Sequence, residues 1–204
     1  MKIYIKTHFY YGQEVALLGS WFRLHFIENE GMAFGMKFGD ASIAKLVLTL
    51  FRLVAVGFGF YYLNVMVKKG FKNATLICAA LILAGAFGNL IDSIFYGKLF
   101  SESGFCLAQW VPWGKGYANL FYGRVVDMLY FPLIEWTLPS STPFIGAYTI
   151  RFFEPVFNIA DASISIGVLT LLFFQKRLLR RIQSKDRRPL RALNSKLRRC
   201  SQTS

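Results

Sequence analysis

Residues 46–67 read LVLTLFRLVAVGFGFYYLNVMV, an apolar run in which Arg52 is the one charged side chain. A helix of this length crosses the roughly 30 Å of hydrocarbon in a bilayer. Residues 74–96 and 155–174 are similar runs, the last with Pro155 at the expected start of its helix, where proline is tolerated. The chain is 54% hydrophobic and 17% charged, against about 25% charged in soluble domains. We therefore expect an all-α transmembrane bundle of three spans.

The positive charge of the chain is concentrated after the third span. The formal net charge is +13, and residues 176–204 hold eleven Lys and Arg with Asp186 as their only acid. A basic segment after an apolar run is typical of a cytoplasmic flank, and it attracts anionic lipid headgroups. No aromatic residues interleave these charges, so nucleic acid is not an expected partner, although a membrane-anchored nucleic-acid-binding protein remains a rival class. We expect residues 176–204 to be a disordered cytoplasmic tail.

The same charge rule orients the rest of the chain. Lys68, Lys69 and Lys72 make the turn between the first two spans basic, which places that turn in the cytoplasm with the tail. Residues 97–154, which balance four basic against four acidic side chains, then form an outer loop, and residues 1–40 lie outside as well.

A small β element is expected in the outer N-terminal part. WFRLHFI at 21–27 alternates like a half-buried strand, and EVALL at 14–18 is placed to pair with it. We expect a hairpin over about residues 14–27, resting on the outer membrane surface.

Cysteine and histidine usage indicates neither a disulfide nor a metal centre. The expected topology places Cys78 within a span, Cys106 outside the membrane and Cys200 inside it. No two of these cysteines can therefore meet to form a disulfide. His8 and His25 have no partner at ligand spacing. No metal and no cofactor are expected.

Acidic side chains near the outer ends of the spans are the candidates for chemistry. Asp92 lies near the outer end of the second span and Asp161 six residues into the third, where an unpaired carboxylate costs several kcal/mol. Asn89 precedes Asp92 by three residues, an interval that puts two side chains on one helical face. Asn158 precedes Asp161 by the same interval. Asp127 lies in an apolar segment typical of a strand or a membrane-dipping chain. The expected topology places all three acids on one side of the membrane, which favours a shared site.

Each of these acids also has a structural interpretation. Asn158 and Asp161 fit a helix N-cap and its partner in the first turn. Asp92 is placed to form an ion pair with Arg52, and Asp127 taken alone resembles an ordinary surface acid.

A transport protein is a further alternative, because intramembrane Asp and Arg side chains also serve as ion relays. A relay needs polar groups along the whole membrane depth. Here the inner halves of the spans are apolar apart from Asn64, which favours a site at the outer face.

Four polar blocks in a fixed order connect these residues to a known family. They are ENEGMAFG (28–35), GNLIDSIFYG (88–97), GRVVDMLYF (123–131) and FNIADASISIG (157–167). On these blocks the chain, up to about residue 175, resembles the lipoprotein signal peptidases (signal peptidase II), the membrane aspartyl peptidases of bacteria. The resemblance implies a multi-pass protein of the bacterial cytoplasmic (inner) membrane. With its active site at the outer face, it would remove the signal peptide from prolipoproteins in the bilayer, cleaving before the diacylglyceryl-Cys.

Motif position implies the roles of individual residues. The catalytic pair would be Asp127 and Asp161, one carboxylate activating a water while its protonated partner polarises the scissile carbonyl. The resemblance implies no metal and no cofactor. The supporting or substrate-binding residues would be Asn29, Asn89, Asp92 and Asn158.

The chain departs from the family pattern at two places. Ser93 stands where the family often has Arg after the aspartate. Family members have four spans, and the first ends in Asp-Gln-x-x-Lys, whereas this sequence begins near that Lys, with Lys2 in its position. We therefore expect a sequence that lacks the first span through truncation or a misplaced start codon. An inactive truncated form is the alternative to an active peptidase.

Overall fold

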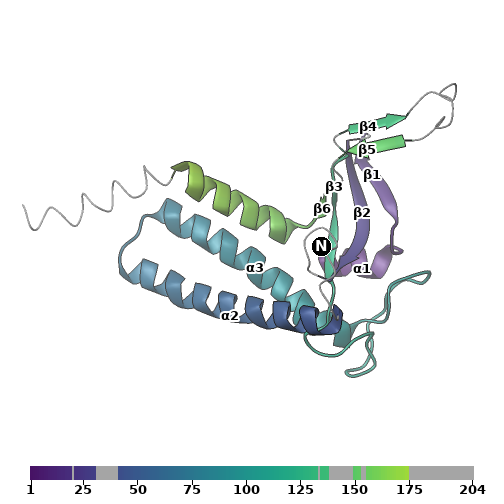
Figure 1. Ribbon diagram of the computed structural model, residues 1–204, viewed down its shortest axis with the longest axis horizontal. Coiled ribbons are helices and arrows are strands. Elements are labelled where there is room, and N and C mark those ends of the chain that lie inside the picture. The colour runs from purple at the N-terminus through teal and green to yellow at the C-terminus, as the bar shows by residue number, and fades with distance from the viewer. Residues whose placement is uncertain (20, 31–40, 133, 138–148, 153–154, 175–204) are drawn as a thin grey trace, which may run out of the picture.

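The computed structural model describes residues 1–174 apart from 20, 31–40, 133, 138–148 and 153–154 (Figure 1). The described chain is mostly helical, with a small antiparallel sheet at one end of the helices. The expectation of a mostly helical fold with a small β element is confirmed, and two of the three expected spans correspond to helices of span length among the described residues. The basic tail at 176–204, and the block at 28–35 from residue 31 onward, lie outside the described residues.

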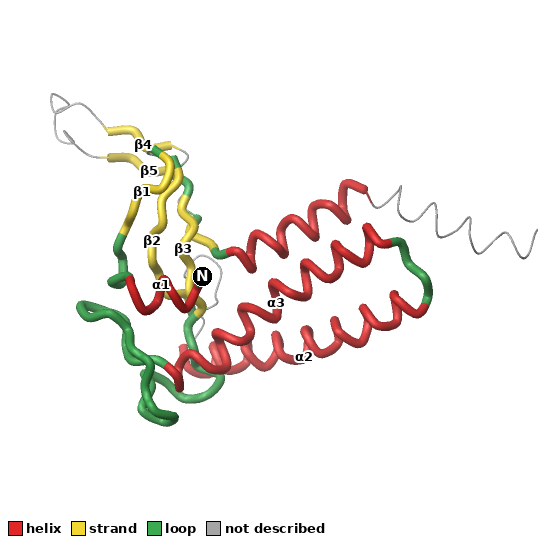
Figure 2. The backbone as a smooth tube through the Cα atoms, turned by 180° about the vertical axis from the view of Figure 1, so that it is seen from behind, coloured by secondary structure: helices red, strands yellow, loops and turns green. Residues whose placement is uncertain are grey.

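Two long apolar helices have the length of membrane spans. Helix α2 runs over Ala41–Lys68 and helix α3 over Asn73–Leu99, and both are long and apolar enough to cross a membrane. Each is several residues longer than the apolar run that predicts it. They are joined by a short turn in which Gly70 has a φ of 67°, a left-handed conformation that glycine adopts without strain. The two helices lie side by side in both views (Figures 1 and 2).

The expected third span begins later than the sequence indicates. Its helix covers Ile159–Phe174 within the described residues and is shorter than a full span. Pro155 does not lie at its start, because Val156–Phe157 form a short strand, β6, that pairs with strand β3 (Val125–Tyr130). Pairing with a neighbouring strand holds these residues extended, so the helix begins only after Asn158.

Two glycines bring this last helix against α3. A Cβ added to Gly85 would collide with the carbonyl oxygen of Ala160, and one added to Gly167 would lie 2.8 Å from the carbonyl oxygen of Cys78. Small residues at such contacts let helix backbones approach closely. The start of the last helix, which carries Asp161, is thereby held next to the middle of α3.

A four-stranded antiparallel sheet lies at the end of the helices opposite the α2–α3 turn (Figure 2). Strands β1 (Glu14–Leu18) and β2 (Phe22–Asn29) form the expected hairpin, with β2 ending two residues later than expected, and the strand order is β1-β2-β3-β6. Strands β4 (Ile134–Thr137) and β5 (Thr149–Phe152) form a separate two-stranded sheet within the expected outer loop.

A short helix that the sequence analysis did not anticipate packs against the sheet. Helix α1 covers Lys2–His8. Its Ile5 belongs to a core cluster with Phe26 of β2, Met128 of β3 and Phe100 after α3. A helix this short has little stability of its own. Tertiary packing, rather than local sequence pattern, therefore decides that α1 forms.

The segment between α3 and β3 is tied by hydrogen bonds to carbonyl groups in the last two turns of α3. Three backbone amides donate to them, at 2.9 to 3.2 Å: Ala118 to Gly97, Phe121 to Ile94 and Gly123 to Ser93. A Cβ on Gly123 would collide with the carbonyl oxygen of Asp92. Strand β3 therefore starts directly beside Asp92, and this contact brings Asp127 to the end of α3.

Candidate active site

Asp127 lies within β3 and is only 2% exposed. Its Oδ1 accepts a hydrogen bond from Asn158 Nδ2 over 2.6 Å, and its Oδ2 accepts one from Asn29 Nδ2 over 3.3 Å. Asn29 is the last residue of β2, and Asn158 directly precedes the last helix. A buried carboxyl group thus has an amide donor on each of its oxygens, supplied by two different elements.

Asp161 lies in the first turn of the last helix, where it forms a capping box with Asn158. Asn158 Oδ1 accepts from the backbone nitrogens of Ala160 at 2.8 Å and of Asp161 at 3.1 Å. In return, the backbone nitrogen of Asn158 donates to Asp161 Oδ2 at 3.2 Å. The structural interpretation of this pair is therefore right. It does not exclude a functional one, because the Asn158 Nδ2 group meanwhile donates to Asp127.

Helix α3 contributes its polar pair from adjacent positions of one face, and Lys2 of α1 joins them. Asn89 Nδ2 donates to Asp161 Oδ1 over 2.7 Å. Lys2 Nζ donates to Asn89 Oδ1 over 2.6 Å and to Asp92 Oδ2 over 2.5 Å. Asp92 is 2% exposed, so the ammonium group compensates a carboxylate that would otherwise be buried without a counter-charge.

The structure joins the six expected site residues in one polar network, which we call the carboxyl network. Its members, in order of contact, are Asp92, Lys2, Asn89, Asp161, Asn158, Asp127 and Asn29. Lys2 is the one member that was not expected in the site, although its position matches a lysine of a family motif. The motif match was the signal in the sequence that could have placed Lys2 in the site. Lys2 and Asp92 are 90 positions apart, so no local pattern connects them.

One interpretation of the sequence paired Asp92 with Arg52. In the structure, Asp92 forms its ion pair with Lys2. Helix α1, which the sequence did not predict, brings this closer cation. The acids that act on Arg52 electrostatically are Asp161 and then Asp127. Arg52 also lies on the same cavity as one member of the candidate catalytic pair, Asp161.

Burial raises the pKa of Asp127 from 3.8 to about 6. The amide of Asn158 opposes this shift, the nearby Asp161 carboxyl adds to it, and Asn29 and Lys2 oppose it. Asp127 consequently keeps its proton at pH values where an ordinary carboxyl group has lost it. Two carboxyl groups in such surroundings can divide the roles of acid and base between them.

A cavity of about 510 Å³ lies between α2, α3 and the last helix. Apolar side chains such as Val56 and Leu83 make up most of its wall, and Arg52, Asn89 and Asp161 line it near the sheet. An apolar chamber with a few convergent polar groups is suited to a largely apolar ligand. In the described part of the chain, no group of three or more His, Cys, Asp or Glu side chains is placed to hold a metal ion.

Comparison with known proteins gives a consistent result over most of the chain. A family model described as Signal peptidase (SPase) II matches residues 1–176. A lipoprotein signal peptidase of Porphyromonas gingivalis is 51% identical over 173 residues, which are 84% of this chain and 74% of that protein. Another, of Amoebophilus asiaticus, is 39% identical over 165 residues, which are 80% of this chain and 65% of that protein. A solved bacterial membrane enzyme aligns at 22% identity and a TM-score of 0.49, covering 86% of this chain and 78% of that one.

Proposed function

The chain belongs to the signal peptidase II family, and we propose from this membership that it is an aspartyl endopeptidase of the membrane. Its proposed substrate is a lipid-modified prolipoprotein, which it cuts before the diacylglyceryl-Cys to release the signal peptide. The observation that carries the proposal is the link through Asn158, whose side chain donates to Asp127 and whose backbone donates to Asp161. Two carboxyl groups held together in this way, beside an apolar cavity, suit peptide hydrolysis at a membrane.

Asp161 is suited to act as the general base. It lies at the N-terminus of the last helix, where the helix dipole favours an anion. It also accepts hydrogen bonds from the side chain of Asn89 and from the backbone of Asn158, which hold its carboxyl group in place. Asp127 is suited to act as the acid, because burial raises its pKa to about 6.

In the proposed reaction, the ionised Asp161 takes a proton from a water molecule whose oxygen attacks the scissile carbonyl carbon. The protonated Asp127 donates a hydrogen bond to the carbonyl oxygen and stabilises the charge that develops there. When the C–N bond breaks, the proton held by Asp161 passes to the leaving amine of the Cys. Both carboxyl groups then return to their starting states without a covalent intermediate.

The apolar cavity supports the assignment of the substrate. A signal peptide helix is apolar along most of its length, and a wall of the kind formed by Val56 and Leu83 offers it a compatible surface. Asn89 and Asp161 line the same cavity and belong to the carboxyl network. We propose that the apolar part of the substrate lies along the cavity with its scissile bond at the network.

We propose that the protein lies in the bacterial cytoplasmic membrane with its active site at the outer face. The basic turn containing Lys68 and Lys69 is at the opposite end of α2 and α3 from the sheet, which supports this orientation. In the same orientation the basic tail at 176–204 lies in the cytoplasm, where anionic lipid headgroups are its proposed partners.

The test is a cleavage assay with the 204-residue chain in detergent or lipid and a diacylglyceryl-modified prolipoprotein. Mass spectrometry should detect loss of the signal peptide with the parent chain and no loss with Asp161→Asn. Equal cleavage by both proteins would contradict the two-Asp mechanism. Absence of cleavage by the parent would favour the inactive form or a transport protein instead.

A further inference from the structure

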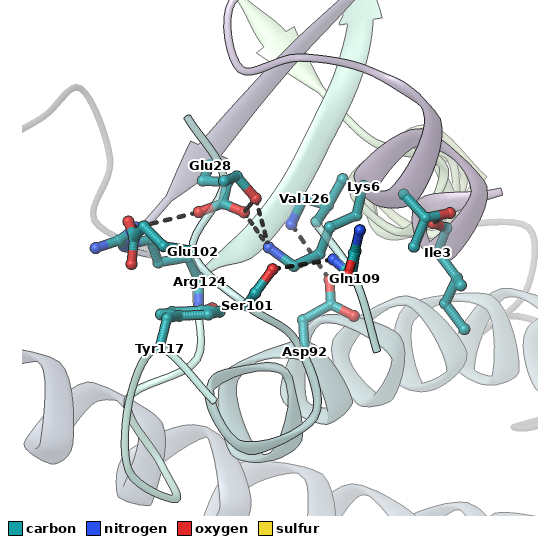
Figure 3. Close-up of polar contacts among 12 residues, drawn as sticks. Ile3, Lys6, Glu28, Asp92, Ser101, Glu102, Gln109, Tyr117, Arg124 and Val126 are labelled. Atoms are coloured by element: carbon teal, nitrogen blue, oxygen red, sulfur yellow. Dashed lines mark hydrogen bonds and ion pairs between the residues drawn. The ribbon is translucent and has the colours of Figure 1, made fainter. Parts of the chain in front are cut away.

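A second cluster of charged side chains, with a buried ion pair at its centre, lies next to the carboxyl network (Figure 3). Lys6 of α1 is completely buried, and the side chain of Glu28 on β2 is 2% exposed. Lys6 Nζ donates to Glu28 Oε1. Ser103 Oγ bonds to both of them, accepting from Lys6 over 2.9 Å and donating to Glu28 over 2.7 Å.

Arg124 and Tyr117 close this cluster on its other side. Arg124 Nη1 donates to Glu28 Oε2 at 3.2 Å and to Glu102 Oε1 at 2.5 Å. The ring of Tyr117 lies 4.9 Å from Lys6 Nζ and 5.1 Å from the Arg124 guanidinium, within cation–π range. The phenol oxygen of Tyr117 accepts from the Arg124 backbone nitrogen at 2.7 Å. Two cations and two carboxylates balance in what we call the Lys6–Glu28 cluster, which consists of Lys6, Glu28, Glu102, Ser103, Tyr117 and Arg124.

Three members of this cluster, Lys6, Glu28 and Arg124, are close in sequence to members of the carboxyl network. Lys6 follows Lys2 by four residues, so both lie on one face of α1. Glu28 and Asn29 are consecutive on β2, so their side chains point to opposite faces of the sheet. Arg124 directly precedes β3, the strand that carries Asp127. The cluster therefore joins α1, β2 and the start of β3, the elements that supply Lys2, Asn29 and Asp127 to the carboxyl network.

We propose that the Lys6–Glu28 cluster positions Lys2 and Asn29 for the peptidase reaction by fixing α1, β2 and the start of β3 relative to one another. The inference rests on the proposed function and adds Lys6 and Glu28 to it as positioning residues.

The chemistry of the cluster supports a directional role over a purely stabilising one. A buried ion pair is generally no more stabilising than apolar side chains of similar volume, because desolvation of the charges is costly. Hydrogen bonds, however, have directions that apolar contacts lack. The two oxygens of Glu28 are bound by different parts of the chain, one by Lys6 and Ser103 and the other by Arg124. Glu28 thereby fixes the orientation of α1 and of the start of β3 relative to β2, as well as the distances between them.

Loss of this positioning has a signature at Asp127. Asn29 and Lys2 both lower the pKa of Asp127, so displacing them raises it above about 6. Two other charged groups interact electrostatically with Asp127. Asp161 on the last helix raises the pKa of Asp127, and Arg52 of α2 is attracted by the Asp127 carboxylate. Asp92 of α3 contacts the adjacent Val126 backbone nitrogen. These groups belong to elements outside the cluster, so they stay in place when it is weakened.

Two variants of the full 204-residue chain test the proposal. Glu28→Gln removes the charge that both cations share, and Ser103→Ala removes one hydrogen bond from each of Lys6 and Glu28 while keeping the ion pair. We expect kcat to fall about tenfold for Glu28→Gln and about threefold for Ser103→Ala, with KM within about twofold of the parent. The alkaline limb of kcat/KM should move to higher pH in both, because Asp127 is the proposed acid. Glu14→Gln, which removes the exposed partner of Arg23 on the hairpin, is the matched control and should leave both quantities unchanged.

A carboxyl ¹³C titration of Asp127, assigned with Asp127→Asn, provides a readout that does not need activity. A higher pKa of Asp127 in Ser103→Ala than in the parent supports the cluster as a positioning device, even for a chain that does not cleave. An unchanged Asp127 pKa in a folded Ser103→Ala protein overturns the inference, whether or not Glu28→Gln folds. Cleavage by the parent with unaltered kinetics and pH profile in both variants overturns it as well, while leaving the proposed peptidase intact. Absence of cleavage by the parent counts against the peptidase alone.

Discussion

The side-chain amide of Asn158 donates to Asp127 Oδ1 over 2.6 Å, while the carbonyl oxygen of the same side chain caps the helix that carries Asp161. One residue therefore ties the sheet to the last helix and sets the relation between two carboxyl groups that lie far apart in the sequence. We expect its loss to affect both the helix start and the proposed reaction, and these two effects can be separated.

Asn158→Ala removes the cap and the amide donor together. We expect about 1 kcal/mol less stability and a partial loss of activity, roughly tenfold or more in kcat. Asn158→Ser restores a capping oxygen without the amide, so its stability should recover while its kcat stays low. Thermal unfolding and steady-state cleavage measure the two effects. Full recovery of kcat in Asn158→Ser would limit Asn158 to capping.

Asp127→Asn and Asp161→Asn should each abolish detectable cleavage while the protein still accumulates in the membrane. An amide can neither take a proton from water nor donate one as a carboxylic acid does. The measurement is signal-peptide release in membranes, with protein amount determined in parallel. A variant that retains activity would remove its residue from the mechanism.

The pH dependence of stability should reveal the buried carboxyl group of Asp127. Its folded-state pKa of about 6 lies above the ordinary carboxyl value of 3.8, so the folded state binds the proton more tightly than the unfolded state. The stabilisation from this group is therefore fully present below about pH 4 and is lost as the pH rises through 6. Asp127→Asn, which stays neutral, should gain up to about 3 kcal/mol relative to the parent between pH 4 and pH 7. Unfolding curves at both pH values check this, and a pH-independent difference would contradict it.

Gly85→Ala should weaken the contact between α3 and the last helix. The new Cβ would collide with the Ala160 carbonyl oxygen, one residue before Asp161, so the last helix must shift away from Asn89. We expect a loss of both stability and cleavage, in the range of about 1–3 kcal/mol for an overpacked contact. Gly57→Ala is the control, because nothing lies within 4 Å of a Cβ at that position on α2. Equal behaviour of the two variants would contradict the tight helix contact.

Deleting residues 178–204 should leave cleavage intact, because the residues of the carboxyl network lie between Lys2 and Asp161. Association with vesicles that contain anionic lipid should weaken, since the deletion removes most of the basic tail. Cleavage and vesicle co-sedimentation of the full and shortened chains measure this. Loss of activity on deletion would show that the tail takes part in the reaction.

Local patterns in the sequence were sufficient for the long helices, the hairpin and the polar pairs on single helical faces. An apolar run of span length, an alternating strand and an Asn three residues before an Asp depend on neighbouring residues alone. The position of Asp127 in an apolar strand could be predicted in the same way. Its connection to Asp161 came from the expected topology, which puts both acids on one side of the membrane, and from a family resemblance, because no local pattern relates residues 34 positions apart.

Only the tertiary structure decided the remaining features. Helix α1 is too short to form without Phe26 and Met128 to pack on Ile5, and its position gives Asp92 the counter-charge of Lys2 instead of Arg52. Backbone pairing with β3 turned the expected start of the third helix into β6. The Lys6–Glu28 cluster likewise arises from contacts between distant segments. Such pairings depend on which surfaces the folded chain brings together, and that information is not contained in any short window of residues.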